Sequence, residues 1–164
     1  MKRFGERRFA AAAEHFRHAA SANPVAGGLC RYLATCYIAL DRHDLAAAEL
    51  GKAVAADPDD VEARIRFALA TWKDGRSDFA EDILRKGLAR RPDDPELQYQ
   101  LGTLIGSEGR FDEAMDLLRR CLRQDPAHAR AHARLAQCLG VQVRRDEAVG
   151  HLREAQRLEP NNGL

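Results

Sequence analysis

The sequence has no long hydrophobic run. None of its apolar stretches approaches the ~20 residues that a membrane-spanning helix needs, so we expect no membrane insertion. No long apolar run follows the basic residues of the N-terminal segment 1–16, so this segment is not typical of a secretory signal. Lys and Arg number 26 against 25 Asp and Glu, and no continuous basic stripe is visible. This balance argues against nucleic acid or an anionic lipid surface as a partner.

Lysine and cysteine are also scarce. Only four of the 26 cations are lysine, and this bias toward arginine, with abundant alanine, is typical of a GC-rich bacterial genome. The four cysteines form no C-x-x-C pair, so they indicate neither a zinc knuckle nor a disulfide framework. We expect them to be small buried residues in a reducing compartment, the cytoplasm of a bacterium. They are Cys30, Cys36, Cys121 and Cys138.

Motifs of catalysis and metal binding are missing. The sequence contains no P-loop, no glycine fingerprint of a dinucleotide fold and no G-x-S-x-G motif. His128 and His132 have the spacing of two metal ligands on one helical face, but nothing nearby supplies a third ligand. His15 and His18 read as solvated surface residues. We therefore expect no enzyme activity, no cofactor and no metal site.

What the sequence has instead is a 34-residue repeat. Five of its six prolines lie 34 residues apart, at Pro24, Pro58, Pro92, Pro126 and Pro160. A small residue stands twelve positions before each of them, at Ala12, Ala46, Ala80, Ala114 and Ala148. A large apolar residue stands eight positions before each, at Phe16, Leu50, Leu84, Leu118 and Leu152.

Each repeat contains two segments of about 14 residues whose apolar residues recur at helical intervals. Small residues recur where two helices must approach closely, and the proline follows the second helix, which it cannot continue. Acidic residues such as Asp60 and Asp94 precede the first helix of a repeat, as N-caps do. The pattern predicts an all-α fold of nine helices: one over residues 8–22, then four antiparallel pairs in phase with the repeat.

The unit resembles the tetratricopeptide repeat. Its best copy has Leu101-Gly102, then Gly-Arg-Phe-Asp-Glu-Ala over 109–114, then Leu118, Cys121 and Pro126. The resemblance implies an α-solenoid that twists into a right-handed superhelix. It divides the single array 1–164 into a half unit, 1–26, and four full units: 27–60, 61–94, 95–128 and 129–162. Because neither end has a capping helix, we expect a piece of a longer array or protein, or ends that a partner covers.

The sequence departs from the family pattern at several positions. The turn glycine is present as Gly75 and Gly109, but Asp41 and Val143 replace it in the first and last full units. We expect the last inter-helix turn to be looser or reshaped. The stretch Pro24–Leu29, with two glycines at the start of a helix, is expected to be soft.

The same resemblance implies a concave groove lined by the first helix of each unit. Carried over by repeat position, the inward residues include five cations and two anions, which leaves a groove charge of +3 on a chain whose net charge is +1. Arginine interleaved with aromatic residues is the usual composition of a binding surface. Charged residues on a helix face can equally be solvated only. The candidate groove residues are Arg31, Tyr32, Ile65, Arg66, Leu69, Lys73, Tyr99, Gln100, Thr103, Arg130, Arg134 and Gln137.

Three functions remain open at this stage. The first is a protein-interaction scaffold that binds an acidic or mixed peptide, or a helix of a partner, in the groove. The second is a structural or self-associating subunit that pairs through its uncapped ends, where Phe9 and Phe16 are expected to leave apolar area open. The third is an accessory repeat region of a larger enzyme such as a transferase.

Overall fold

The computed structural model describes the backbone of residues 2–22 and 27–160, and the side chains of residues 8–19 and 28–160. Within these ranges the chain forms nine helices and no strand. The first is α1 (Lys2–Ala22), which begins six residues before the expected start at residue 8. The others form four pairs: α2 (Gly27–Ala39) with α3 (His43–Ala56), α4 (Val61–Lys73) with α5 (Ser77–Arg90), α6 (Pro95–Ser107) with α7 (Phe111–Gln124), and α8 (Ala129–Val141) with α9 (Arg145–Leu158).

Helix starts and ends follow the repeat without drift. The first helices begin at residues 27, 61, 95 and 129, and the second helices begin at 43, 77, 111 and 145, always 34 residues apart. The predicted all-α fold and its phase are therefore confirmed. The expected soft stretch Pro24–Leu29 lies partly outside the described residues, and the two glycines that belong to it fall inside α2.

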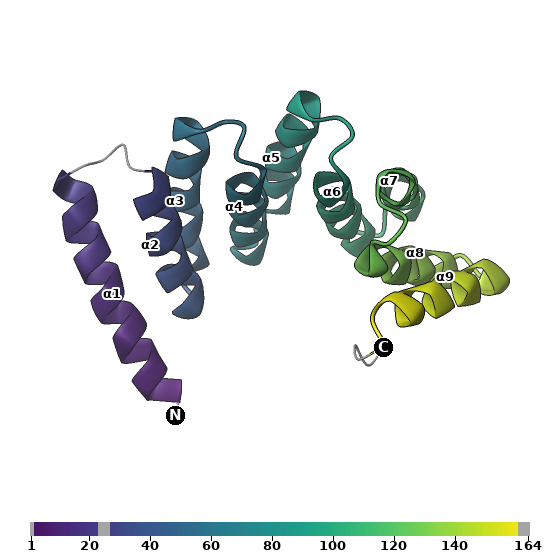
Figure 1. Cartoon of the computed structure of the whole chain (residues 1–164), viewed down its shortest axis with the longest axis horizontal. Coiled ribbons are helices and arrows are strands. Elements are labelled where there is room, and N and C mark those ends of the chain that lie inside the picture. Colours follow the sequence, from purple (N-terminus) through teal and green to yellow (C-terminus); the bar gives the residue numbers. More distant parts are fainter. Residues whose placement is uncertain (1, 23–26, 161–164) are drawn as a thin grey trace. The chain divides into compact units, whose positions relative to one another are not determined.

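The helices form two compact blocks, one over Met1–Gly87 and one over Leu88–Leu164. We call them the N-terminal and the C-terminal block. In the N-terminal block α1 packs on α2, α2 on α3 and α3 on α4; in the C-terminal block α6 packs on α7, α7 on α8 and α8 on α9 (Figure 1). Contacts thus run mainly between neighbours in sequence, as in a solenoid. A single array over 1–164 stays a prediction.

The first helices α4, α6 and α8 begin with a side-chain cap at one fixed repeat position. Asp60 accepts a hydrogen bond from the Ala63 backbone N–H, and Asp94 accepts one from that of Leu97. At the next equivalent position the cap is a histidine: His128 Nδ1 accepts a hydrogen bond of 3.1 Å from the Ala131 backbone N–H. Each cap satisfies one of the donors that a helix N-terminus leaves without a partner.

The fourth position of the last three repeats, where the family usually has tryptophan, makes a different recurring contact. Arg64 donates to the carbonyl oxygen of Pro58 at 2.7 Å, and Gln98 donates to that of Pro92 at 2.8 Å. His132 Nε2 lies 3.1 Å from the carbonyl oxygen of Pro126. Because each bond links a helix to the proline six residues before it, it fixes the entry of the chain into that helix.

The turns inside the helix pairs all have the same geometry. The turn residue has a positive φ in each: 58° at Asp41, 82° at Gly75, 83° at Gly109 and 61° at Val143. The backbone N–H after it donates five residues back, as from Arg144 to Leu139 at 3.0 Å. The expectation of a reshaped last turn was therefore wrong: the turn keeps its form and forces a β-branched residue into a conformation that favours glycine.

Small residues stand where two helices touch. Ala46, Ala80 and Ala114 have no exposed surface, and Ala148 is 7% exposed. A Cβ on Gly102 would lie only 3.1 Å from Leu118 Cγ and 3.2 Å from the Ala114 carbonyl oxygen, so α6 and α7 can approach this closely only over glycine. These contacts confirm the predicted role of the small positions.

Large apolar residues fill the space around these contacts. In the C-terminal block Leu97, Leu101, Ile105 and Leu139 are almost completely buried. In the N-terminal block the core divides into smaller clusters, one of which joins Ala34, Ala46, Ala47, Leu50 and Ala70. Burial at this scale is the main stabilising term of the fold.

The four cysteines are buried free thiols, as predicted. Burial raises the pKa of Cys121 to about 12, so this thiol is protonated at neutral pH. At the N-terminal end Phe16 is half-buried and stacks on Tyr32 at 5.5 Å between ring centroids, while Phe9 is 41% exposed. No helix of the described residues is long and apolar enough to cross a membrane.

Candidate functional site

The predicted groove residues fall on the first helix of each pair. Six belong to the N-terminal block: Arg31 and Tyr32 on α2, and Ile65, Arg66, Leu69 and Lys73 on α4. Six belong to the C-terminal block: Tyr99, Gln100 and Thr103 on α6, and Arg130, Arg134 and Gln137 on α8. Four of the twelve are buried, namely Ile65, Tyr99, Gln100 and Thr103, so these can contribute only the floor of a binding face.

In the N-terminal block the arginines of this face already have partners. Arg31 forms an ion pair with Asp60 at 2.7 Å. Arg66 donates to the hydroxyl of Thr35 at 2.6 Å and lies 3.8 Å from a carboxylate oxygen of Glu62. The positive charges of these two arginines are therefore partly neutralised by carboxylates of the same block.

A cavity of about 270 Å³ lies beside Arg66. It is formed by α2, the start of α3 and α4. Arg66 and Lys73 bring positive charge to it, and the rest of its lining is mostly apolar. Its lining consists of Ile38, His43, Arg66, Leu69, Ala70 and Lys73.

In the C-terminal block the carboxylate of Glu96 is the common partner of several side chains, two of which are predicted groove residues. Gln100 donates to it at 2.7 Å, and Arg130 reaches it at 3.1 Å. His128 Nε2 lies 3.2 Å from it, and since Nδ1 of the same ring accepts the cap hydrogen bond, Nε2 is the donor. The hydrogen bond from His128 holds the pKa of Glu96 below its usual value.

Tyr99 and Arg130 are held by the same cluster. The Arg130 guanidinium carbon lies 4.9 Å from the centroid of the Tyr99 ring. The centroid of the His128 ring lies 4.7 Å from the same Tyr99 centroid. Both residues were predicted to contact a partner. Their main contacts in this structure are internal, so Arg130 offers a charge that Glu96 already neutralises in part.

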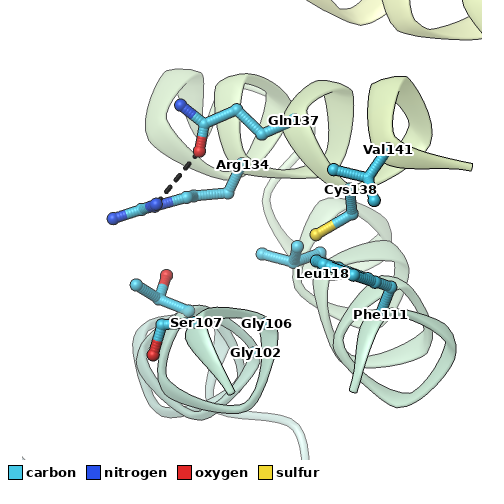
Figure 2. Close-up of a pocket in the computed structure, with 10 residues that line it drawn as sticks. Gly102, Gly106, Ser107, Phe111, Leu118, Arg134, Gln137, Cys138 and Val141 are labelled. Carbon is cyan, nitrogen blue, oxygen red and sulfur yellow. Dashed lines mark hydrogen bonds between the residues drawn. The ribbon is translucent and has the colours of Figure 1, made fainter. Parts of the chain in front are cut away.

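A second cavity, of about 220 Å³, opens between α6, α7 and α8 (Figure 2). Arg134 and Gln137 stand together on one side of it, with a hydrogen bond of 3.0 Å from the guanidinium to the amide oxygen. Cys138, Leu118 and Phe111 gather on the other side (Figure 2). The full lining is Gly102, Thr103, Gly106, Ser107, Phe111, Leu118, Arg134, Gln137, Cys138 and Val141.

The two cavities occupy the same place in the repeat. Residues of the first cavity correspond to residues of the second with an offset of 68, which is two repeats. Arg66 thus corresponds to Arg134, and Leu69 to Gln137. Lys73, also a predicted groove residue, corresponds to Val141. The sequence analysis did not select the remaining pairs, although the same offset identifies them: Ile38 with Gly106, His43 with Phe111, and Ala70 with Cys138.

The histidines that were considered for metal binding have structural contacts. His132 donates from Nε2 to a carbonyl oxygen, so its Nδ1 accepts the 2.8 Å hydrogen bond from Nδ1 of His151. Burial, aided by His132, holds the pKa of His151 below its usual value. Among the described residues, no group of three or more His, Cys, Asp and Glu side chains could hold a metal ion.

Paired helices in phase with a 34-residue period define a helical-repeat protein. A tetratricopeptide repeat model matches residues 39–102 and 107–163, and a second one matches 3–61. The chain belongs to the tetratricopeptide repeat family. The comparison with curated proteins gives no match.

Solved structures with this fold include several proteins named MamA. One is 23% identical over 93% of this chain and 89% of that chain, with a TM-score of 0.80. Another, from Desulfovibrio magneticus RS-1, is 16% identical over 99% of this chain and 93% of that chain, with a TM-score of 0.78. YrrB, described as a TPR protein with an unusual peptide-binding site, is 20% identical over 95% of this chain and 80% of that chain, with a TM-score of 0.72. At these identities the similarity shows the fold alone.

Proposed function

We propose that this protein is a non-catalytic interaction scaffold that holds an acidic segment of a partner protein against its first helices. The observation that carries the proposal is the recurrence of one cavity, with an arginine on its lining, at the same repeat positions in both blocks. A site that is repeated in this way gives each block a place to bind an acidic segment by itself. YrrB, a protein with the same fold, is described as having a peptide-binding site, which supports this kind of ligand.

The charge of the site favours an acidic ligand. Arg66 and Lys73 line the first cavity and Arg134 lines the second, and no carboxylate is part of either lining. Arginine can bind a carboxylate through two parallel hydrogen bonds, which adds geometric selectivity to the attraction. The free thiols suit a reducing compartment, and we propose the cytoplasm of a bacterium as the place of action.

The test is site-specific photo-cross-linking in cells of the source organism. A photo-reactive residue at Leu69 or at Gln137 is expected to capture the same partner, because both positions line a cavity. The same residue at Asp116, an exposed position on α7, serves as the control. Capture from Asp116 but from neither cavity position would place the binding surface elsewhere and refute the proposal.

Charge reversal gives an independent test. The double variant Arg66→Glu plus Arg134→Glu is expected to lose the cross-linked partner, whereas Arg153→Glu, at an exposed position on α9, is expected to keep it. Circular dichroism of the three proteins checks that they stay folded. Full retention of the partner by the folded double variant would contradict the proposal.

A second candidate function is self-association through α9. Leu152 is 40% exposed and Val149 is 44% exposed, although Leu50, Leu84 and Leu118, at the repeat position of Leu152, are nearly completely buried. Covering such a side chain contributes ~1.5–3 kcal/mol. If a second copy covers this face, light scattering will show a dimer that Leu152→Ser dissociates; a monomer at high concentration argues against it.

A further inference from the structure

A third cavity, of about 300 Å³, lies between α3, α4 and the start of α5, all within the N-terminal block. It shares no lining residue with the cavity beside Arg66, so it is separate from the predicted groove. Small and aromatic residues form most of it, and two charged residues complete it. The lining consists of Asp44, Ala47, Ala48, Gly51, Phe67, Arg76 and Phe79.

The repeat pattern is broken at this cavity. Ala48 and Gly51 of α3 have neither a charge nor a long side chain. Their counterparts on α1, α5 and α7 are all charged: Glu14 and Arg17, Asp82 and Arg85, and Asp116 and Arg119. On α1 and α7 the two counterparts form an exposed ion pair, at 3.9 Å and 3.6 Å. The sequence of α3 therefore removes charges that the repeat otherwise has at these positions.

Phe67 is partly exposed although its repeat position otherwise belongs to the core. Leu33, Leu101 and Leu135 stand at the same position and are at most 2% exposed, whereas Phe67 is half-buried. A Cβ on Gly51 would lie 3.3 Å from Phe67 Cζ, so a longer side chain at residue 51 would stand directly against the ring. Glycine at this position leaves the ring open to a ligand.

Phe79 supplies a second aromatic wall. It is 44% exposed, and the next two repeats have a glutamate at its position. Its ring lies nearly perpendicular to that of Phe67, with 5.9 Å between centroids, and the Arg76 guanidinium carbon lies 5.8 Å from its centroid. Because these contacts orient the exposed ring in advance, a ligand does not have to order it on binding.

The charges around the two rings leave one carboxylate without a partner. Two ion pairs account for the others: Arg42 with Asp44 at 3.2 Å, and Arg76 with Asp74 at 2.8 Å. Asp78, which directly precedes Phe79, forms no ion pair or side-chain hydrogen bond with any residue that the structure describes. Three carboxylates against two guanidinium groups give a net charge of −1 here. The surroundings therefore favour a cationic ligand, unlike the two groove cavities, whose linings contain cations and no carboxylate.

The shape of the cavity suits a side chain presented by a helix. Ala47 and Gly51 lie one turn apart on α3, so another helix can approach α3 here much as α7 approaches α6 over Gly102. An apolar cavity of roughly 150 Å³ accommodates benzene. The 300 Å³ beside Phe67 and Phe79 are enough for an aromatic ring, which gains from packing against other rings.

We propose that this cavity binds an aromatic side chain on a basic helix of a partner protein, with a Lys or Arg of that helix, one turn from the aromatic residue, paired with Asp78. The site differs from the groove in position and in the charge of its ligand. The chain can therefore hold two partners of opposite charge, one at each surface. This second surface does not depend on the acidic ligand proposed for the first helices.

The experiment measures binding of synthetic helical peptides to the full chain, by fluorescence anisotropy and by nuclear magnetic resonance of the protein amides. The first probe is an alanine-based and glutamine-based helix of about 16 residues, with a central Phe and a Lys one turn before and after it. It is expected to shift the amides of Ala48, Gly51 and Phe79. Replacing its Phe by Ala should weaken binding at least tenfold. Replacing both Lys by Gln should weaken it roughly threefold, and by Glu further.

Variants of the protein test the same contacts. Ala48→Glu plus Gly51→Arg, which restores the charged pair of α1, should abolish binding and leave the helix content unchanged. Phe79→Ser, at an exposed position, should weaken binding at least tenfold and covers the case in which the double variant does not fold. Asp78→Asn should weaken the Lys peptide roughly threefold and leave the Gln peptide unaffected. Asp116→Ala, at the equivalent of Ala48 on α7, is the matched control and should bind normally.

Equal affinity for the Phe and Ala peptides, or shifts that avoid the cavity, would overturn the assignment of the aromatic site. Equal or tighter binding of the Glu peptide would overturn the preference for a basic helix. Absence of binding by every probe at millimolar concentration would overturn the proposal as a whole. A dimer of the protein alone that Phe79→Ser dissociates would assign the cavity to a second copy and overturn the partner protein. Cross-linking at Leu69 tests the groove independently, so the two functions fail separately.

Discussion

Val143 occupies a backbone conformation that its side chain disfavours, and replacing it by glycine should stabilise the protein. Its φ of 61° is positive, like those of the turn glycines Gly75 and Gly109. A left-handed conformation costs a residue with a Cβ ~1–2 kcal/mol. Val143 is 70% exposed, so its side chain contributes little burial that glycine would lose.

The net gain follows from two opposing terms. Val143→Gly removes the ~1–2 kcal/mol of backbone strain but adds ~0.5–1 kcal/mol of chain entropy to the unfolded state. The difference is a stabilisation of ~0–1.5 kcal/mol, and each 1 kcal/mol corresponds to a rise of ~2–4 °C in melting temperature for a chain of this length. Asp41→Gly should gain less, because aspartate tolerates this conformation better than a β-branched residue.

The measurement is hydrogen exchange of the backbone amides around the α8–α9 turn, together with the urea midpoint. A local probe is needed because repeat arrays can unfold in parts. Val143→Ala is the matched control: it shortens the side chain but keeps a Cβ, so it should give little or none of the gain. The reverse change, Gly109→Val, should destabilise by the same net amount, ~0–1.5 kcal/mol. If Val143→Gly leaves exchange and midpoint unchanged or lowers them, the strain argument is wrong.

Three further predictions concern packing, capping and pH. Ala114→Leu should cost ~1–3 kcal/mol by overpacking a contact with no free space, and an unchanged melting temperature would contradict the close helix contact. Asp94→Ala should cost ~1 kcal/mol through loss of the cap on Leu97, and hydrogen exchange should rise at the start of α6, with an unchanged rate as the opposing result. Because burial and His132 lower the pKa of His151 in the folded state, the stability gained from its neutral form is complete above the unfolded value of 6.5 and is lost as pH falls below it. The urea midpoint should therefore decrease from pH 7.5 to 5.5 in the wild type and decrease less in His151→Gln; an equal decrease in both proteins would rule out this residue as the cause.

The sequence by itself determined the helices, their phase and the family. Helix formation depends on residues three and four apart, and packing of a repeat depends on a small residue at a fixed position, so both leave a periodic signal that can be read without coordinates. The start of α1 was placed six residues too late, because the segment before residue 8 has no repeat partner against which to set its phase. The turn at Val143 was misjudged for another reason: residue preference suggested a different turn, but the surrounding helix pair kept the common one.

Only the tertiary structure decided which of the predicted groove residues already have partners within the chain. Arg130 and Arg134 are neighbours on α8, yet the first meets Glu96, 34 residues away in sequence, and the second meets only Gln137. Such pairings depend on which side chains lie opposite each other across two packed helices and on their reach. No local pattern encodes this, because the partners are brought together by the stacking of repeats rather than by the helix that carries them.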